Sequence, residues 1–334
     1  MRTVLVTGGA GYVGSHTCKT LAEAGYNPVT YDNLSRGHRD AVRWGPLVVG
    51  DIADRDKLRA TFDKYEPEAI VHFAAYTYVG ESVGDPSLYY RNNVTGSLAL
   101  IESAVEAGIR RIVFSSTAAT YGTPQYMPLT EEHNTLPINP YGRSKLVVEQ
   151  MLTDADQAYG LRSVALRYFN AAGADPEGEI GEDHDPETHA IPLAIQAVLG
   201  QRPPFQIFGT DYQTRDGTAI RDYVHVMDLA SAHVKALEYL ARGGASTQIN
   251  LGTGTGTSVK ELIDAVSAVA GKPVPHSAGP RREGDPSVLV AGNQKARELL
   301  GWEPRFQDLS EIVGTAWRWH TVGLEQRRRA VAAA

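Results

Sequence analysis

Short apolar runs alternate with helix-length amphipathic segments through the first half of the chain. The apolar runs are rich in β-branched residues and predict buried strands at residues 2–7, 27–31, 47–49, 69–73, 111–115 and 162–167. The segments between them predict helices, most clearly at residues 12–24, 86–107 and 141–158. Because strands that alternate with helices form parallel sheets, this half predicts a doubly wound parallel α/β sheet.

The alternation weakens after residue 170. Residues 173–188 are rich in Gly, Pro, Asp and Glu and predict an irregular loop, and residues 210–218 predict a polar turn. We expect only short elements around these loops: strands at 205–208, 223–226 and 249–251, and helices at 191–199, 228–240, 293–299, 309–320 and from Ser258. Asp228 is expected to cap one of these helices, and Ser258 with Glu261 to form a capping box on another.

These patterns predict two domains. Residues 1–170 form the first, with 221–251 returning to its sheet, and residues 171–220 and 252–334 form a smaller mixed α/β domain.

Composition narrows the class of protein. The 334 residues are 42% hydrophobic and 21% charged, as in an ordinary globular protein, and the net charge of −7 argues against a general affinity for nucleic acid or anionic membranes. The single cysteine, Cys18, excludes an intrachain disulfide and a cysteine zinc site, and we expect no metal site. No apolar run reaches transmembrane length and the chain enters a strand at once, so we expect a cytoplasmic protein without a leader.

A glycine-rich turn follows the first predicted strand and opens the first helix. It reads Gly8-Gly9-Ala10-Gly11-Tyr12-Val13-Gly14, a G-x-x-G-x-x-G variant of the dinucleotide fingerprint. Gly8 and Gly11 permit a tight turn close to a pyrophosphate, and Gly14 lets the helix pack on the strand. A glycine turn without a ligand is the alternative, but the flanking strand and helix favour a Rossmann cofactor site.

Acidic residues follow the second and third strands. Asp32, next to Asn33, lies where a carboxylate accepts the 2′-hydroxyl of the adenosine ribose, which favours NAD over NADP. Asp51 and Ile52 are placed to flank an adenine, although a helix N-cap by Asp51 or Asp54 explains that carboxylate equally well.

Small and polar residues follow the fourth and fifth strands, at the edge where open α/β sheets bind ligands. Ala74 and Ala75 let a cofactor pass close to the backbone, and Thr117 is the candidate for a second catalytic hydroxyl, with a local Ser/Thr turn as the alternative. Asn93 lies within a predicted helix, where pairing with backbone is slightly favoured over a ligand contact.

Tyr141 and Lys145 are four residues apart, so on a helix they share one face. A phenol ionises near pH ~10, and a neighbouring ammonium lowers that pKa. The pair is therefore suited to moving a proton to and from a substrate hydroxyl. A surface tyrosine beside a solvated lysine is the alternative for this pattern taken alone.

Together these motifs resemble the extended short-chain dehydrogenase/reductases and, within them, the UDP-glucose (UDP-galactose) 4-epimerases. The resemblance runs nearly end to end. Its anchors are the segments 7–14, 32–33, 50–52, 89–94, 114–116, 140–145, 167–170, 221–228 and 281–285.

The resemblance implies the chemistry and its residues. Bound NAD takes a hydride from C4 of the hexose while Tyr141 takes the proton of the C4 hydroxyl. Lys145 lowers the pKa of Tyr141, and Thr117 relays or orients the proton. The 4-keto sugar then turns over and is reduced on its other face. NAD is expected to contact Gly8, Gly11, Tyr12, Val13, Gly14, Asp32, Asn33, Asp51, Ile52, Phe73, Ala74, Ala75, Asn93, Ser115, Tyr141, Lys145 and Tyr168.

The resemblance also implies a clamp for the nucleotide and a homodimer. Besides Thr117 and Tyr141, the substrate is expected to contact Asn170 and His189 near the phosphates and sugar, Phe208 at the uracil, Arg221 and Arg282 at the diphosphate, and Asp285 at the ribose. The helices at 86–107 and 141–158 are expected to pair across a two-fold axis. Arg327-Arg328-Arg329 is expected to be a solvated tail.

Three positions depart from the family pattern. Thr77 lies where some members have Lys, His189 where others have Asn, and Leu289 leaves the acceptance of N-acetylated sugars open.

Three other functions are weighed against the 4-epimerase. A 4,6-dehydratase needs an acid and a base after Thr117, and Ala118-Ala119 supplies neither. A 4-epimerase of another UDP-sugar (an N-acetylhexosamine, pentose or uronic acid) stays open. A non-catalytic NAD- or nucleotide-sugar-binding regulatory protein would usually lack Tyr141 or Lys145.

Overall fold

A seven-stranded parallel sheet forms the centre of the computed structural model, which describes residues 2–282 and 285–327. Its strand order is β11-β6-β5-β4-β1-β2-β3, and each of its pairings is parallel. The strands are β1 (Thr3–Thr7), β2 (Asn27–Asp32), β3 (Leu47–Val49), β4 (Ala69–His72), β5 (Arg111–Ser115), β6 (Arg162–Tyr168) and β11 (Thr247–Leu251). The prediction of a doubly wound parallel sheet is therefore confirmed, with the order reversing between β1 and β4.

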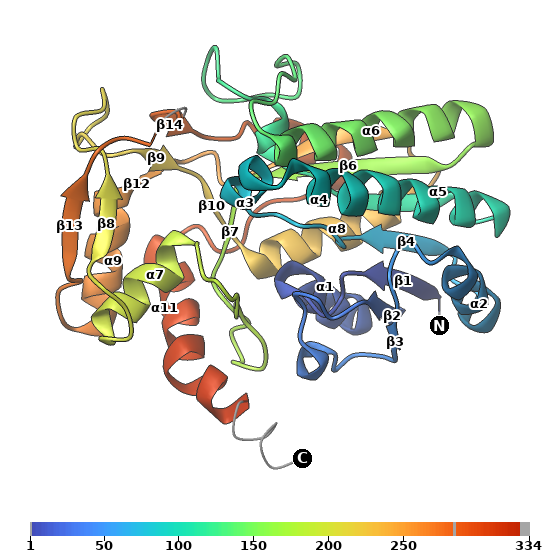
Figure 1. Ribbon diagram of the computed structural model, residues 1–334, viewed down its shortest axis with the longest axis horizontal. Coiled ribbons are helices and arrows are strands. Elements are labelled where there is room, and N and C mark those ends of the chain that lie inside the picture. Colours follow the sequence, from blue (N-terminus) through green and yellow to red (C-terminus); the bar gives the residue numbers. More distant parts are fainter. Residues whose placement is uncertain (1, 283–284, 328–334) are drawn as a thin grey trace.

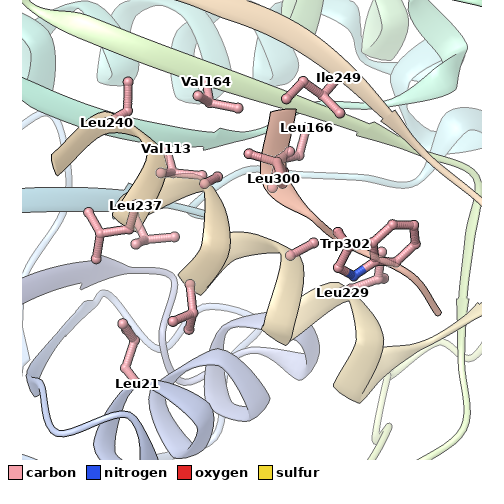
Figure 2. Packing of buried hydrophobic residues seen from close by; sticks show 14 of the residues in the cluster. Leu21, Val113, Val164, Leu166, Leu229, Leu237, Leu240, Ile249, Leu300 and Trp302 are labelled. Carbon is pink, nitrogen blue, oxygen red and sulfur yellow. The ribbon is translucent and has the colours of Figure 1, made fainter. Parts of the chain in front are cut away.

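Helices cover both faces of this sheet (Figure 1). One face carries α2 (Arg55–Tyr65), α5 (Ser97–Glu106) and α6 (Pro140–Tyr159), and the other carries α1 (Tyr12–Glu23) and α8 (Val226–Ala241). Figure 2 shows the second face, where Leu237 and Leu240 of α8 belong to one buried cluster with Val113 and Val164 of the sheet. Burying each such side chain contributes about 1.5–3 kcal/mol, so α8 is held to the sheet mainly by apolar packing.

The segment that contains α8 and β11 comes late in the chain but lies with the large sheet. Ile249 of β11 is paired with Leu166 of β6, and α8 packs against α1. In the same segment β10 (Tyr223–His225) pairs with β7 (Asn170–Ala172) in a separate two-stranded sheet.

A third apolar core, besides those on the two faces of the large sheet, lies among the shorter elements beside that sheet (elements in Figure 1). Its helices are α7 (Ala190–Val198), α9 (Val259–Ala270) and α11 (Leu309–Arg318). Two small sheets adjoin it: β8 (Phe205–Phe208) with β13 (His276–Gly279), and β12 (Thr257–Ser258), β9 (Ile220–Arg221) and β14 (Val288–Leu289). The remaining elements are η1 (Arg39–Ala41), α3 (Val79–Gly84), η3 (Ala118–Thr120), α10 (Gln294–Leu300) and η4 (Trp319–Gly323).

The predicted single helix at 86–107 is wrong in its middle. The structure divides it into α4 (Pro86–Tyr89), a π-helical segment η2 (Tyr90–Gly96) and α5. The side chain of Asn93 in η2 bonds the N–H and the carbonyl of Tyr76 at 2.9 and 3.0 Å, and Ser97 Oγ donates to the Asn93 carbonyl. Widened helical turns often mark functional sites, and here the widening holds the chain that follows β4.

The expected cap at Asp228 is also wrong. Helix α8 begins two residues earlier, where His225 Nδ1 accepts from the Met227 N–H at 3.2 Å. Asp228 instead accepts from the backbone N–H groups of Arg305 and Phe306 at 3.0 and 2.9 Å, which ties the C-terminal segment to α8. The capping box of Ser258 and Glu261 is confirmed at the start of α9.

Arg327 corrects the expectation of a solvated tail. Its guanidinium pairs with Asp40 and, at 3.0 Å, with Asp183, and its side chain is 15% exposed. Arg328 and Arg329 lie outside the described residues. No helix in the described ranges is both long and apolar enough to cross a bilayer.

Candidate active site

A cavity of about 980 Å³ opens at the carboxyl ends of the central strands, between the large sheet and the shorter elements. Most of the predicted site residues line it. They are Gly8, Gly11, Tyr12, Val13, Gly14, Asp32, Asn33, Ile52, Phe73, Ala74, Ala75, Ser115, Thr117, Tyr141, Lys145, Tyr168, Asn170, His189, Arg221, Arg282 and Asp285. The fold therefore brings together residues that are more than 270 positions apart in the sequence.

The glycine-rich turn has the shape that a pyrophosphate cradle needs. Gly8 has a φ of +73°, and a Cβ there would lie 2.6 Å from the Ala74 nitrogen. A Cβ on Gly14 would lie 2.2 Å from the Gly8 carbonyl oxygen. No side chain caps the start of α1, so its first N–H groups are left for an anion. These features fit the phosphates of a dinucleotide.

Asp32 lies at the end of β2, on the cavity wall. Its two oxygens accept from the backbone N–H groups of Ala10 and Leu34 at 3.0 and 2.8 Å. Burial raises the pKa of Asp32, and these two hydrogen bonds oppose that rise. Each carboxylate oxygen keeps a second lone pair, so Asp32 can still accept from a ribose hydroxyl.

Three predicted contacts do not line the cavity: Asp51, Asn93 and Phe208. Asp51 accepts from Asn33 and from the Ala53 N–H, and the N-cap of α2 is Asp54. Asn93 bonds the Tyr76 backbone, which is the alternative that its place in a helix favoured.

Phe208 carries the guanidinium of Arg282 over its ring at 3.9 Å. The geometry thus places the Arg282 cation, and not the Phe208 ring, at the cavity wall.

Tyr141 is held on the first turn of α6. Asn139 caps this helix by accepting from the Gly142 N–H at 2.8 Å, and Pro140 occupies its first position. Burial raises the pKa of Tyr141 to about 12, while a hydrogen bond with Thr117 lowers it. Thr117 also caps η3 by accepting from the Ala119 N–H at 3.1 Å, so the local turn that was the alternative for Thr117 is present, and its catalytic role stays a prediction.

Lys145 lies one turn further along α6 and is buried. Its ammonium donates to the Ser115 carbonyl at 2.9 Å and lies 4.8 Å from the centre of the Phe114 ring. Burial lowers the pKa of Lys145 to about 7, and the Glu149 carboxylate opposes this shift. Burial and Thr117 set the pKa of Tyr141 in the chain alone, so the lowering expected from Lys145 stays a prediction.

Tyr168 adds a third hydroxyl to this wall. It shares a 2.6 Å hydrogen bond with Ser115 Oγ, and burial raises its pKa. Tyr141, Thr117 and Tyr168 are thus all neutral hydroxyls near neutral pH, facing one cavity.

The opposite wall supplies the cations and amides of the expected nucleotide clamp. Arg221 donates to Asp285 at 2.5 Å and to the Ile220 carbonyl at 2.8 Å. Asn170 donates to the Asp222 carbonyl at 3.0 Å, which leaves its side-chain oxygen as an acceptor. The arrangement suits a diphosphate next to a sugar.

His189 lines the cavity but faces carboxylates at its Nδ1. Burial lowers its pKa, but Glu182 and Glu187 outweigh burial and raise it to about 10. The sequence reasoning missed these two carboxylates and His184. The spacing Glu182-x-His184-x-x-Glu187-x-His189 was a signal that this loop is more than a connection.

The fold and the site define a class of protein: a dinucleotide-dependent α/β enzyme with a Tyr–Lys pair. Residues 4–252 match the NAD dependent epimerase/dehydratase family, and the chain belongs to that family.

Named relatives narrow this class. The chain is 62% identical over 318 residues to a UDP-glucose 4-epimerase of Rhizobium leguminosarum bv. trifolii, which covers 95% of this chain and 97% of that protein. The crystal structure of UDP-glucose 4-epimerase from Brucella ovis in complex with NAD superposes with a TM-score of 0.93 at 52% identity, covering 95% and 98% of the two chains. The Bifidobacterium longum UDP-glucose 4-epimerase, in complex with NAD⁺ and UDP, superposes with a TM-score of 0.90 at 36% identity, covering 96% and 98%.

Proposed function

We propose that this chain interconverts UDP-galactose and UDP-glucose by NAD-mediated oxidation and re-reduction at sugar C4. The observation that carries the proposal is the hydrogen-bonded pair of Tyr141 and Thr117 beside buried Lys145, on the wall of a cavity that also holds a dinucleotide cradle. The names of the relatives, at up to 62% identity over nearly the whole chain, support the same activity.

Tyr141 takes the proton of the C4 hydroxyl and later returns one. Its hydroxyl is neutral near neutral pH and is bonded to Thr117, so a substrate hydroxyl that reaches either oxygen joins one proton-transfer chain. The same phenol serves both directions because each half-reaction reverses the other.

Lys145 can gain or lose a proton near neutral pH, because its pKa of about 7 places the ammonium near the midpoint of its titration. NAD, when bound, accepts the hydride from C4 and returns it. The uncapped start of α1, Gly8 and Gly14 fit its pyrophosphate, and Asp32 fits the hydroxyl of its ribose.

The nucleotide is held more firmly than the sugar. Arg221 and Arg282 bind the diphosphate, Asp285 the uridine ribose, and Asn170 and His189 the region between phosphate and sugar. A sugar that has lost its C4 hydrogen can then turn over while the UDP stays in place. The guanidinium of Arg282 covers the ring of Phe208. Phe208 therefore acts at the uracil end of the substrate only by holding Arg282 in place.

A 4-epimerase of another UDP-sugar is the second candidate. Leu289 lines the cavity, so its side chain limits the room beside the sugar. An activity screen separates the candidates: purified protein is incubated, without added cofactor, with UDP-galactose, UDP-glucose, their N-acetyl forms and UDP-xylose. We expect UDP-glucose to form from UDP-galactose. If no sugar is converted, with NAD added or not, the non-catalytic binding protein is the better reading.

Three further assignments belong to this proposal. The protein acts as a homodimer through the helices η2, α5 and α6; it acts in the cytoplasm; and residues 171–220 and 252–334 form the UDP-sugar domain. Leu98 of α5 and Tyr159 of α6 are large apolar side chains with 41% and 60% exposure, which is consistent with a partner on this face.

A further inference from the structure

The loop between β7 and α7 contains two clusters of carboxylates, and they differ in what neutralises them. In the first, the ammonium of Lys19 donates to Asp175, Glu177 and Glu179 at 3.0, 2.5 and 2.9 Å. A cation of the chain therefore already occupies this cluster, and it has no need of an ion.

The second cluster consists of Glu182, His184, Glu187 and His189. The carboxylates are buried, with side chains 3% and 2% exposed. Within residues 2–282 and 285–327, neither carboxylate bonds an Arg or Lys side chain; their side-chain partners are the two imidazoles. The charge of these two buried carboxylates is therefore offset by imidazoles alone, and the carboxylates hold the pKa of His189 at about 10.

The side-chain atoms of this cluster that could bind a metal lie close to one another. Glu182 Oε1 is 3.0 Å from His184 Nδ1 and 2.7 Å from His189 Nδ1. Glu187 Oε1 is 2.9 Å from His189 Nδ1, and its other oxygen is 3.9 Å from His184 Nδ1. One ligand atom from each residue lies within 4.8 Å of all the others.

We propose that Glu182, His184, Glu187 and His189 form a site for a divalent transition metal of the Zn²⁺ type, bound through the two Nδ1 atoms and one oxygen of each carboxylate. Atoms at about 2.0–2.2 Å from a tetrahedral Zn²⁺ lie about 3.3–3.6 Å apart. Glu182 Oε1 and Glu187 Oε1 lie 2.7–3.0 Å from the Nδ1 atoms that they bond, so these atoms must separate by about half an ångström to complete the tetrahedron.

The donor set selects the kind of ion. Two imidazoles with two carboxylates suit Zn²⁺ and its neighbours, whereas Mg²⁺ and Ca²⁺ prefer oxygen ligands alone. A divalent ion would displace the proton that His189 carries, and two neutral imidazoles, two carboxylates and the ion then sum to zero charge. The site differs from the expectation, made from the sequence, that the chain has no metal site.

Such an ion would fasten the loop at the cavity. His184 and His189 both line the cavity, and the rings of Tyr12 and Tyr78 lie edge-on to His184 at 6.0 and 6.1 Å. Coordination through Nδ1 leaves each Nε2 with its hydrogen as a donor. The metal is therefore a positioning group for this wall and takes no part in hydride or proton transfer.

Metal content tests the site without reference to activity. The purified holoenzyme is treated with EDTA, desalted, equilibrated with ZnCl₂ at about pH 8, where protons compete less for Nδ1, and desalted again before mass-spectrometric metal analysis. We expect one Zn²⁺ per chain, and a tetrahedral visible spectrum when Co²⁺ replaces it. His184→Asn and Glu187→Gln should each weaken binding at least tenfold, whereas His276→Asn, at an exposed histidine on β13, should not.

Two results overturn the proposal: wild-type protein that retains no Zn²⁺, or the His184 and Glu187 variants retaining as much as wild type. Where a variant does not fold, as judged by circular dichroism, the anomalous signal of zinc in crystals of the wild-type holoenzyme decides the question. A peak away from these four residues refutes the site.

Discussion

At the scale of single residues, burial shifts the pKa values of Tyr141 and Lys145 in the direction that favours the neutral form of each group. It raises the pKa of the phenol to about 12 and lowers the pKa of the ammonium to about 7, so near neutral pH the phenol is neutral and Lys145 is near the midpoint of its titration. A phenol that is neutral at rest can donate a proton as well as accept one. A reaction that runs in both directions needs that property.

Tyr141→Phe tests the proton-transfer role. The variant removes one oxygen and keeps the ring in its packing, so NAD and UDP binding should persist while kcat falls by about 10²–10⁴. Steady-state rates and titration with UDP separate the two effects. Tyr126→Phe, at an exposed tyrosine that does not line the cavity, is the matched control and should keep wild-type rates. Wild-type turnover in Tyr141→Phe would remove Tyr141 from the mechanism.

Lys145→Met tests the cost of burying the ammonium. The folded pKa of about 7 lies below the ordinary value of 10.5, so between these values the unfolded chain binds more protons and wild-type stability rises with pH. Met does not titrate, so the variant should gain on wild type by an amount on the order of a few kcal/mol below pH 7, shrinking toward pH 10.5. Urea unfolding of the two cofactor-free proteins across this range measures the difference. A difference that does not change with pH would contradict the shifted pKa.

At the scale of elements, the connections after the strands decide what the cavity can bind. The turn from β1 to α1 leaves no room for side chains at Gly8 or Gly14, and η2 widens where Asn93 holds the backbone of Tyr76. The strands themselves contribute few ligand contacts. They set the positions from which these connections approach the cavity.

Gly14→Ala tests the close approach of α1 to the turn. The added Cβ would lie 2.2 Å from the Gly8 carbonyl oxygen, so we expect a loss of about 1–3 kcal/mol in the free energy of unfolding and a loss of bound NAD. Thermal unfolding and the absorbance of the cofactor measure these effects. Gly314→Ala, in α11 with nothing within 4 Å, is the control and should be neutral or stabilising. Equal behaviour of the two variants would show that the turn tolerates a side chain.

At the scale of the whole molecule, three apolar cores support one cavity: two on the faces of the large sheet and one among the shorter elements. The large sheet carries the cofactor cradle and Tyr141, and the shorter elements carry Arg221, Arg282 and the loop of His189. The C-terminal segment ties the parts together, since Asp228 accepts from Arg305 and Phe306. This enzyme of the NAD dependent epimerase/dehydratase family is thus assembled from segments that are distant in sequence.

Sedimentation tests the proposed dimer. Wild-type protein at micromolar concentration should sediment as a dimer, and Leu98→Asp, which places a charge on the exposed face of α5, should shift it toward the monomer. Val322→Asp, at another exposed apolar residue in η4, should leave the dimer intact. A wild-type monomer would refute the assembly.

The sequence by itself determined those features that depend on local geometry: the parallel sheet, the glycine-rich turn and the ends of α6. Alternation of strands and helices predicted the parallel sheet, because each strand must be buried on both faces. The sequence also predicted that the glycine turn, Asp32, Tyr141 and Lys145 lie at one site, because their spacing is tied to local geometry. In the structure they line one cavity. Asn139 caps the start of α6, and Gly160, with a φ of +68°, caps its end. Both lie within two residues of the predicted helix at 141–158.

Only the tertiary structure decided how distant groups change one another. The break at η2 depends on Asn93 meeting Tyr76, the pKa of Tyr141 depends on its burial, and the pairing of Arg327 with Asp40 spans most of the chain. The cluster of His184 and His189 with its carboxylates was visible as spacing, but its burial without a lysine or arginine was not. Local spacing is a property of the sequence, whereas desolvation and long-range charge pairing exist only once the chain is packed.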